Sequence, residues 1–239
     1  MKKLQIVDAH HHLWDLTLGW YDWLVGDPKP FLLGDYTALR RNYLPADYRI
    51  DAWGLEVLAA SAAAPTGPGS LSDPHWLEGM RKLARYQWSW DLRVPFWHLE
   101  EAAGVLEKVP ELEVVLNHTG LPWDRSEAGL AHWRKGMKAL ARLPQVYCKI
   151  SELGLLNAAW TVASNQRVVQ EAVELFGPSR CMFGSNFPVA SLRVGFLSQV
   201  LGIDKMLQHL TAAERHDIFV NNAISFYRLE PFCRQVQKH

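Results

Sequence analysis

The alternation of short apolar runs with amphipathic helical stretches is the feature that most constrains the fold of this chain. Strands that alternate with helices predict a parallel sheet with helical crossovers, built either as a closed barrel or as an open doubly wound sheet. No glycine-rich nucleotide-binding loop follows the first apolar run, which removes the usual signal of the open sheet and favours a (β/α) barrel. The predicted strands span 5–10, 55–60, 88–94, 112–117, 146–151 and 181–185, and the predicted helices span 76–86, 99–108, 132–143, 165–176 and 212–227.

Length and composition agree with one such domain. The 239 residues come close to the ~250 that are typical of a (β/α)₈ barrel, so we expect residues 1–239 to form a single domain. Lysine plus arginine equals aspartate plus glutamate, at 25 each, and this balance indicates neither nucleic acid nor an anionic membrane as a partner. No apolar stretch approaches the ~18 residues of a membrane span, and no long apolar leader region follows the N-terminal lysines.

Cysteine usage indicates the compartment. Cys148, Cys181 and Cys233 are scattered and form neither a CxxC pair nor an even disulfide framework, which fits a reducing environment. We expect Cys148 and Cys181 to lie in strand cores. The expected location is the cytoplasm, and the expected partner is a small-molecule substrate.

The first predicted strand ends in a run of histidines, Asp8-Ala9-His10-His11-His12. Because side chains alternate along a strand, Asp8, His10 and His12 share one face and His11 points to the other. Two imidazoles at the carboxyl end of a barrel strand can bind one metal ion at the active face of the barrel. The alternative interpretation is a set of solvated or helix-capping histidines, and His11 fits a structural role better than a ligand role.

Two later strand ends carry further polar residues. His118 follows the apolar run Val114–Leu116 and enters a glycine loop, where it would add the third protein ligand of a catalytic metal site. A hydrogen-bonded loop histidine is the alternative. Asn186 follows the run Cys181–Phe183 and would point at the same barrel mouth, although an asparagine turn before Pro188 explains it equally well.

These segments together resemble the amidohydrolase-2 family, and within it the lactonase-like TIM-barrel hydrolases that act on lactones of sugar acids and dicarboxylates. The resemblance extends from Gln5 to Leu229. The segments that carry it are DAHHHLWD, VVLNHTGLP, VYCKIS, FGPSRCMFGSNFPV and AAERHDIFVNNAISFYRL. It implies a metal-dependent hydrolase with one divalent ion, zinc or manganese.

The resemblance also implies roles for individual residues. His10, His12 and His118 would be the metal ligands. Asn186 stands where active relatives usually carry the aspartate that serves as metal ligand and general base, and an amide is not a base near neutral pH. Asn186 could still ligate weakly or orient a water. No carboxylate is evident beside it, so we take Asp91 as the best substitute base. The candidate substrate-binding residues are Trp14, Trp20, Arg93 and Arg125.

The chain is shorter than the family pattern. In relatives, one strand lies between the segments that match Asp47–Ile50 and Trp53–Leu58, and another lies between Pro65 and Leu71. Each βαβ step needs roughly 30 residues, so the short links here cannot contain them. We therefore expect an incomplete barrel of about six parallel strands, whose exposed edges could gape, rearrange or pair in a homo-oligomer.

Three functions remain open from the sequence. The leading hypothesis is hydrolysis of a lactone or similar cyclic ester. Asn186 and the absent strands favour a second one, a catalytically impaired or non-catalytic truncated relative. The third is a metal-dependent decarboxylase, because the wider family includes such enzymes.

Overall fold

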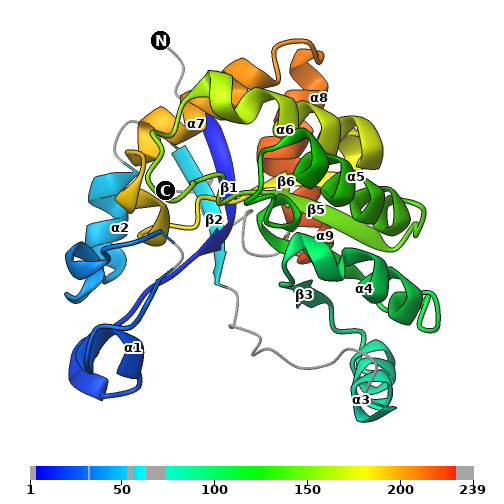
Figure 1. Ribbon diagram of the computed structural model, residues 1–239, viewed down its shortest axis with the longest axis horizontal. Helices are drawn as coiled ribbons and strands as arrows, with labels where there is room; N and C mark the ends of the chain where they lie inside the picture. Colours follow the sequence, from blue (N-terminus) through cyan, green and yellow to red (C-terminus); the bar gives the residue numbers. More distant parts are fainter. Residues whose placement is uncertain (1–3, 32, 53–55, 63–73, 230–239) are drawn as a thin grey trace.

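The computed structural model of the protein describes residues 4–31, 33–52, 56–62 and 74–229. It contains two parallel sheets, one with the order β1-β2 and one with the order β3-β4-β5-β6 (Figure 1). Every pairing within them is parallel, as the alternation of strands and helices predicted. The strands are β1 (Gln5–His11), β2 (Glu56–Ala62), β3 (Trp90–Leu92), β4 (Val114–Leu116), β5 (Val146–Ile150) and β6 (Cys181–Phe183).

The two sheets meet where β6 ends beside β1. His11 forms a parallel bridge with Phe187, and His12 N–H donates to the Phe187 carbonyl at 2.7 Å. Asn186 N–H donates to the His10 carbonyl at 2.6 Å. The strands therefore follow the order β2-β1-β6-β5-β4-β3, and within the described chain β2 and β3 do not pair. Over the described residues, this arrangement confirms an incomplete TIM-type barrel of six parallel strands, open between β2 and β3.

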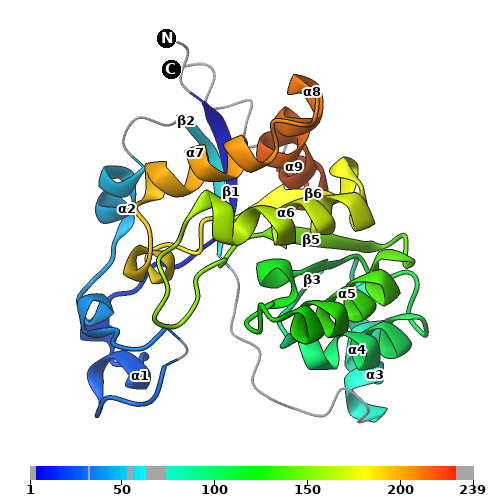
Figure 2. The same cartoon turned by 45° about the horizontal axis from the view of Figure 1, so that its top comes forward.

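Helices lie outside the strands. Figures 1 and 2 show α4, α5 and α6 side by side along the four-stranded sheet, with α1 on the far side of the molecule from them. The α-helices are α1 (Asp22–Val25), α2 (Pro45–Asp51), α3 (Pro74–Arg85), α4 (Leu99–Leu106), α5 (Glu127–Ala141), α6 (Val162–Phe176), α7 (Phe196–Met206), α8 (Ala212–His216) and α9 (Asn222–Phe226). Short 3₁₀ turns span Leu16–Leu18, Thr37–Leu39, Phe96–His98, Asn117–Gly120, Pro178–Arg180 and Val189–Leu192.

Local capping explains where the structure departs from the predicted helix bounds. The Ser126 side chain accepts from Gly129 N–H at 3.0 Å, so α5 begins at Glu127 rather than at residue 132. Thr161 caps α6 in the same way. The last predicted helix is divided by a π-helical turn, Asp217–Asn221, between α8 and α9, and this segment packs against β1 and β6.

The core lies between the four-stranded sheet and its helices. Val114, Val115 and Leu116 are fully buried, as expected for parallel strands covered on both faces. Cys148 and Cys181 are buried and free, which confirms their predicted place in strand cores, whereas Cys233 lies outside the described residues. No helix in the described ranges is long and apolar enough to cross a membrane.

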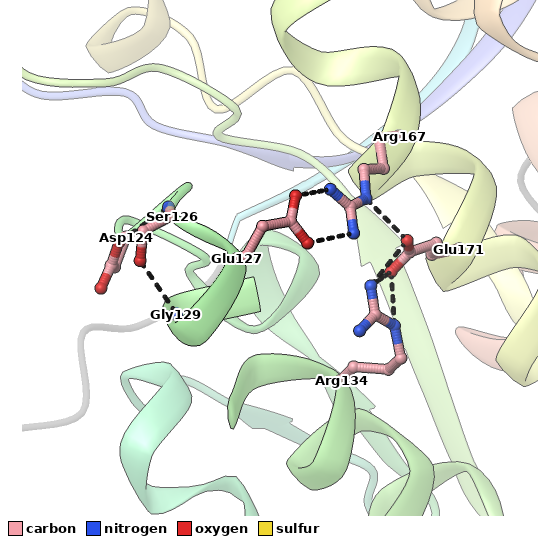
Figure 3. A network of polar contacts seen from close by, with 7 residues as sticks. All are labelled: Asp124, Ser126, Glu127, Gly129, Arg134, Arg167 and Glu171. Atoms are coloured by element: carbon pink, nitrogen blue, oxygen red, sulfur yellow. Dashed lines mark hydrogen bonds and ion pairs between the residues drawn. The ribbon is translucent and has the colours of Figure 1, made fainter. Parts of the chain in front are cut away.

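Ion pairs join α5 to α6 on the surface (Figure 3). Arg167 pairs with Glu127 at 2.5 Å and with Glu171 at 3.0 Å, and Arg134 binds both oxygens of Glu171. Hydrogen bonds to the two glutamates raise the pKa of Arg167. Exposed pairs contribute only about 0–1 kcal/mol each, so the network adds little to the stability of the fold.

Candidate active site

The carboxyl ends of β1, β4 and β6 bring four of the predicted site residues together. The ring centroids of His10 and His12 lie 5.0 Å apart, and those of His10 and His118 lie 4.4 Å apart. His12 Nε2 lies 2.9 Å from Asn186 Oδ1. Three segments that are distant in sequence therefore form one polar cluster at the barrel mouth.

Asp8 and Gly184 hold β1 against the end of β6. Asp8 Oδ1 accepts from the N–H groups of Ser185 (2.7 Å) and His10 (3.2 Å), while Oδ2 accepts from the hydroxyls of Ser185 (2.6 Å) and Tyr48 (2.7 Å). A Cβ at Gly184 would lie 2.8 Å from the Cβ of His10, so only glycine permits this close approach. Asp8 therefore stabilises the joint between β1 and the end of β6 and is not a further member of the histidine cluster, although it shares a strand face with His10.

Burial keeps the histidines of the cluster neutral. It is the main reason that the pKa of His10 and that of His118 lie well below the usual value. Burial also lowers the pKa of His12 to about 4, against the opposing hydrogen bond to Asn186. The positive charges of Arg93 and Lys149 act in the same direction on all three. Neutral imidazoles are the form that binds metal ions.

This shift predicts acid sensitivity. Between about pH 6.5 and pH 4 the unfolded chain protonates His12 and the folded chain does not, so the free energy of unfolding should fall as the pH is lowered through this window. At ~1.4 kcal/mol per pKa unit, His12 would account for at most about 3 kcal/mol. Urea unfolding at pH 7.5 and pH 5 should show that His12→Asn loses less stability on acidification than the parent.

His98 provides the matched control, because it is exposed and pairs with Glu101 at the surface. His98→Asn should keep the acid sensitivity of the parent protein. Equal acid sensitivity of His12→Asn and the parent would contradict the assignment to His12.

The cluster has nitrogen atoms available for a metal ion. Both ring nitrogens of His10 are buried and have no hydrogen-bond partner among the described residues, which is costly for an imidazole that binds nothing. His12 Nε2 and His118 Nδ1 instead face Asn186 and Ser151, the latter at 3.0 Å. Accordingly, within the described ranges no three His, Cys, Asp or Glu side chains already form a ready-made metal site. The donor set fits an ion such as zinc once these two imidazoles turn toward it.

The sequence shows no carboxylate at the strand end that carries Asn186, but the structure places one beside it from the end of another strand, because Glu152 follows β5. Its Oε2 accepts a short hydrogen bond from Asn186 Nδ2, and its side chain is buried. Burial raises the pKa of Glu152, while the bond from Asn186 and the charges of Arg93 and Arg193 oppose this effect. Its position two residues after the predicted strand segment Val146–Ile150 was the signal that could have identified it.

Asp91, the substitute base expected from the sequence, is held by other groups. Lys149 Nζ lies 2.5 Å from Asp91 Oδ2, and Tyr227 donates to Oδ1 at 2.7 Å. Lys149 is fully buried, which lowers its pKa, and Asp91 opposes that effect. Glu152 is therefore the better candidate for a carboxylate that acts on the cluster.

The candidate substrate-binding residues lie in different surroundings. Trp14 is buried, with its ring centroid 6.2 Å from that of His12, and packs against Trp23 and Tyr43. Trp20 is 76% exposed and so lies on the surface, apart from the buried cluster.

The two arginines differ as well. Arg93 is exposed, and its charge reaches the histidines and Glu152. Arg125 is half-buried and donates to Asn165 at 3.2 Å, but its Nε and Nη1 have no partner in the described part of the chain. Burial lowers the pKa of Arg125 to about 10.

The strand ends that form the cluster share an unusual backbone. His118, Thr119, Leu121, Glu152 and Asn186 all have positive φ angles, between 42° and 58°. A non-glycine residue in this region costs about 1–3 kcal/mol, and such residues concentrate at functional sites. The backbone thus marks the ends of β4, β5 and β6 as a candidate active site.

The family follows from comparison with known proteins. The amidohydrolase model Amidohydro_2 matches residues 63–229, which is more than half of the chain. The chain belongs to the amidohydrolase-2 family. An amidohydrolase from Burkholderia multivorans, solved with bound zinc, has the same fold at a TM-score of 0.78 and 21% identity, and the match covers 94% of this chain and 99% of that one.

Curated relatives point to lactonases. The L-fucono-1,5-lactonase of Burkholderia multivorans is 30% identical over 171 residues, which cover 66% of this amidohydrolase and 57% of the lactonase. Protein y4mH of Sinorhizobium fredii is 31% identical over 301 aligned positions, covering 96% of this chain and all of that protein.

The alignment with y4mH also bears on the incomplete barrel. Because this chain has only 239 residues, at least 62 of the 301 positions face a gap in it. Two βα steps of roughly 30 residues each would fill a gap of that size. The comparison therefore agrees with a barrel that lacks two strands.

Proposed function

We propose that this amidohydrolase is a metal-dependent hydrolase of a lactone or similar cyclic ester of a sugar acid or dicarboxylate. The convergence of His10, His12, His118 and Asn186 at the barrel mouth is the observation that carries the proposal. The likeness to lactonases supports the substrate class.

The histidines and Asn186 would have different roles in this reaction. His10, His12 and His118 would hold one divalent ion, zinc or manganese, through neutral imidazole nitrogens. When bound, such an ion would supply polarisation of a carbonyl oxygen and activation of water. Asn186 can orient a water or ligate through its oxygen, but it cannot take a proton.

Residues around the cluster would bind the substrate. The free Nε and Nη1 groups of Arg125 lie on different edges of the guanidinium, so each would donate a separate hydrogen bond to an oxygen of the substrate. Arg93 would add positive charge at the same mouth. Trp14 would form the wall next to His12, and Trp20 would contribute at most from the surface.

Metal analysis is the first test of this function. Purified protein loaded with zinc should hold up to one ion per chain, and His12→Ala should lose it. His98→Ala is the matched control, because the His98 side chain is 50% exposed and pairs with Glu101 at the surface. Full zinc occupancy in His12→Ala would refute the ligand assignment.

Activity is the second test, with the proton released on lactone opening as the signal. A general base typically contributes 10²–10⁴-fold, so a site with Asn186 should hydrolyse lactones slowly or not measurably. The absent strands also favour slow hydrolysis. This outcome would support the second candidate function, that of a catalytically impaired family member. Brisk turnover by the unmodified chain would show that another base acts. Release of carbon dioxide from a cyclic acid would instead indicate a decarboxylase.

A further inference from the structure

We infer that Glu152 is a positioning residue of this site, which fixes the Asn186 amide with its oxygen toward the histidines. Only the zinc-binding test of this inference rests on the proposed function. Its first support is contact: Oε2 of Glu152 accepts from Asn186 Nδ2, while Asn186 Oδ1 lies 2.9 Å from His12 Nε2. Asn186 is thus held between a carboxylate and an imidazole.

The second support is the chemistry of the amide. An ionised carboxylate only accepts hydrogen bonds, whereas an amide has one accepting end and one donating end. In its ionised form Glu152 therefore accepts from the NH₂ of Asn186, and this is the orientation in the structure. The flipped amide would set its oxygen against a carboxylate oxygen, and that arrangement is repulsive. Without Glu152 both orientations are open, because a neutral imidazole can either donate to an amide oxygen or accept from an amide NH₂.

The third support is the way Glu152 is built into the fold. The side chain is 6% exposed, and the backbone of Gly154 favours its charged form together with Asn186. Its φ angle is +42°, a conformation that glutamate rarely adopts. A Cβ at position 154 would lie 2.9 Å from Oε1, so Gly154 leaves the room that the carboxylate occupies. A buried acid held in this way is costly unless it serves a partner.

The fourth step concerns charge. Glu152 places one negative charge next to an amide that carries none. Asn186→Asp alone would put two carboxylates in contact, where they must share a proton or separate. Combining Glu152→Gln with Asn186→Asp keeps one charge and one donor–acceptor contact, with the direction of the hydrogen bond reversed. The double variant should therefore recover what each single variant loses.

Zinc titration of the full-length, metal-free protein tests the inference. Glu152→Gln should weaken zinc binding about 10-fold, the lower end of the effect of residues that orient metal ligands. Asn186→Asp should lower the melting temperature, and the double variant should restore it and bind zinc within a few-fold of the parent. Glu127→Gln is the surface control and should change both quantities little, because Glu127 pairs with the exposed Arg167.

A second readout needs no metal. In the metal-free protein, Asn186 Oδ1 requires the His12 tautomer with its proton on Nε2, which nitrogen-15 chemical shifts report. Glu152→Gln should populate the other tautomer as well. Unchanged zinc affinity with an unchanged tautomer in Glu152→Gln would overturn the inference, and so would strictly additive losses in the double variant. If the parent binds no zinc, the proposed function fails and the tautomer result alone decides the role of Glu152.

Discussion

Asp91→Ala should lower the free energy of unfolding by about 3–5 kcal/mol, because it leaves the ammonium of Lys149 buried without a counter-charge. Lys149 is fully buried and contacts Asp91 at 2.5 Å, and the Tyr227 hydroxyl would lose its acceptor as well. For a domain of this size the melting temperature should fall by roughly 6–20 °C. Thermal and urea unfolding, monitored by circular dichroism, would measure the loss.

Two further variants distinguish the loss of the buried ion pair from a general loss of stability. Glu78→Ala removes the partner of Lys82 in an exposed pair and should cost less than about 1 kcal/mol. Lys149→Met combined with Asp91→Ala removes both charges and should recover much of the stability lost in Asp91→Ala alone. If Asp91→Ala unfolds like the parent protein, Asp91 is not the structural counter-ion, and its interpretation as a base regains weight.

The strand pattern could be predicted from the sequence, because parallel strands buried on both faces read as short apolar runs. All six runs became strands, at bounds that differ by at most two residues. The open edge was also predicted, since the links on either side of β2 are too short for further βα steps. Helix α7 was missed, although its buried residues Phe196, Val200 and Ile203 have the spacing of one helical face.

The site was predictable only in part. His10, His12 and His118 follow apolar runs, and strand ends meet at one face of a barrel, so their convergence follows from the topology. Glu152 obeys the same rule, but a lone glutamate after a strand is common and the sequence does not show that it contacts Asn186. Asp91 has the right position in sequence, yet a contact between residues 91 and 149 depends on strand register that no local pattern reveals.

The joint between the two sheets gives the last prediction. Within the described residues, the backbone of β1 pairs with the four-stranded sheet only where β6 ends. Asp8 accepts four hydrogen bonds at this joint, two from backbone N–H groups and two from hydroxyls. The stability of the joint, and with it the alignment of His10 beside Asn186, should therefore depend on Asp8.

Asp8→Ala should destabilise the protein by at least about 3 kcal/mol, since each buried donor left without an acceptor costs about 1–3 kcal/mol. It should also weaken zinc binding, because His10 and Asn186 would no longer be held on opposite sides of one joint. Urea unfolding and zinc titration of the same preparation would measure the two effects together.

Asp8→Asn is the matched control, and its outcome follows from the geometry. The side-chain oxygen of the new asparagine can take the place of Oδ1 and accept from the N–H groups of His10 and Ser185. Its NH₂ would take the place of Oδ2, and the hydroxyls of Tyr48 and Ser185 can rotate to accept from it. Asp8→Asn should thus lose much less stability than Asp8→Ala and keep most of the zinc affinity. Equal losses in the two variants would show that the negative charge of Asp8, rather than its hydrogen bonds, holds the two sheets together.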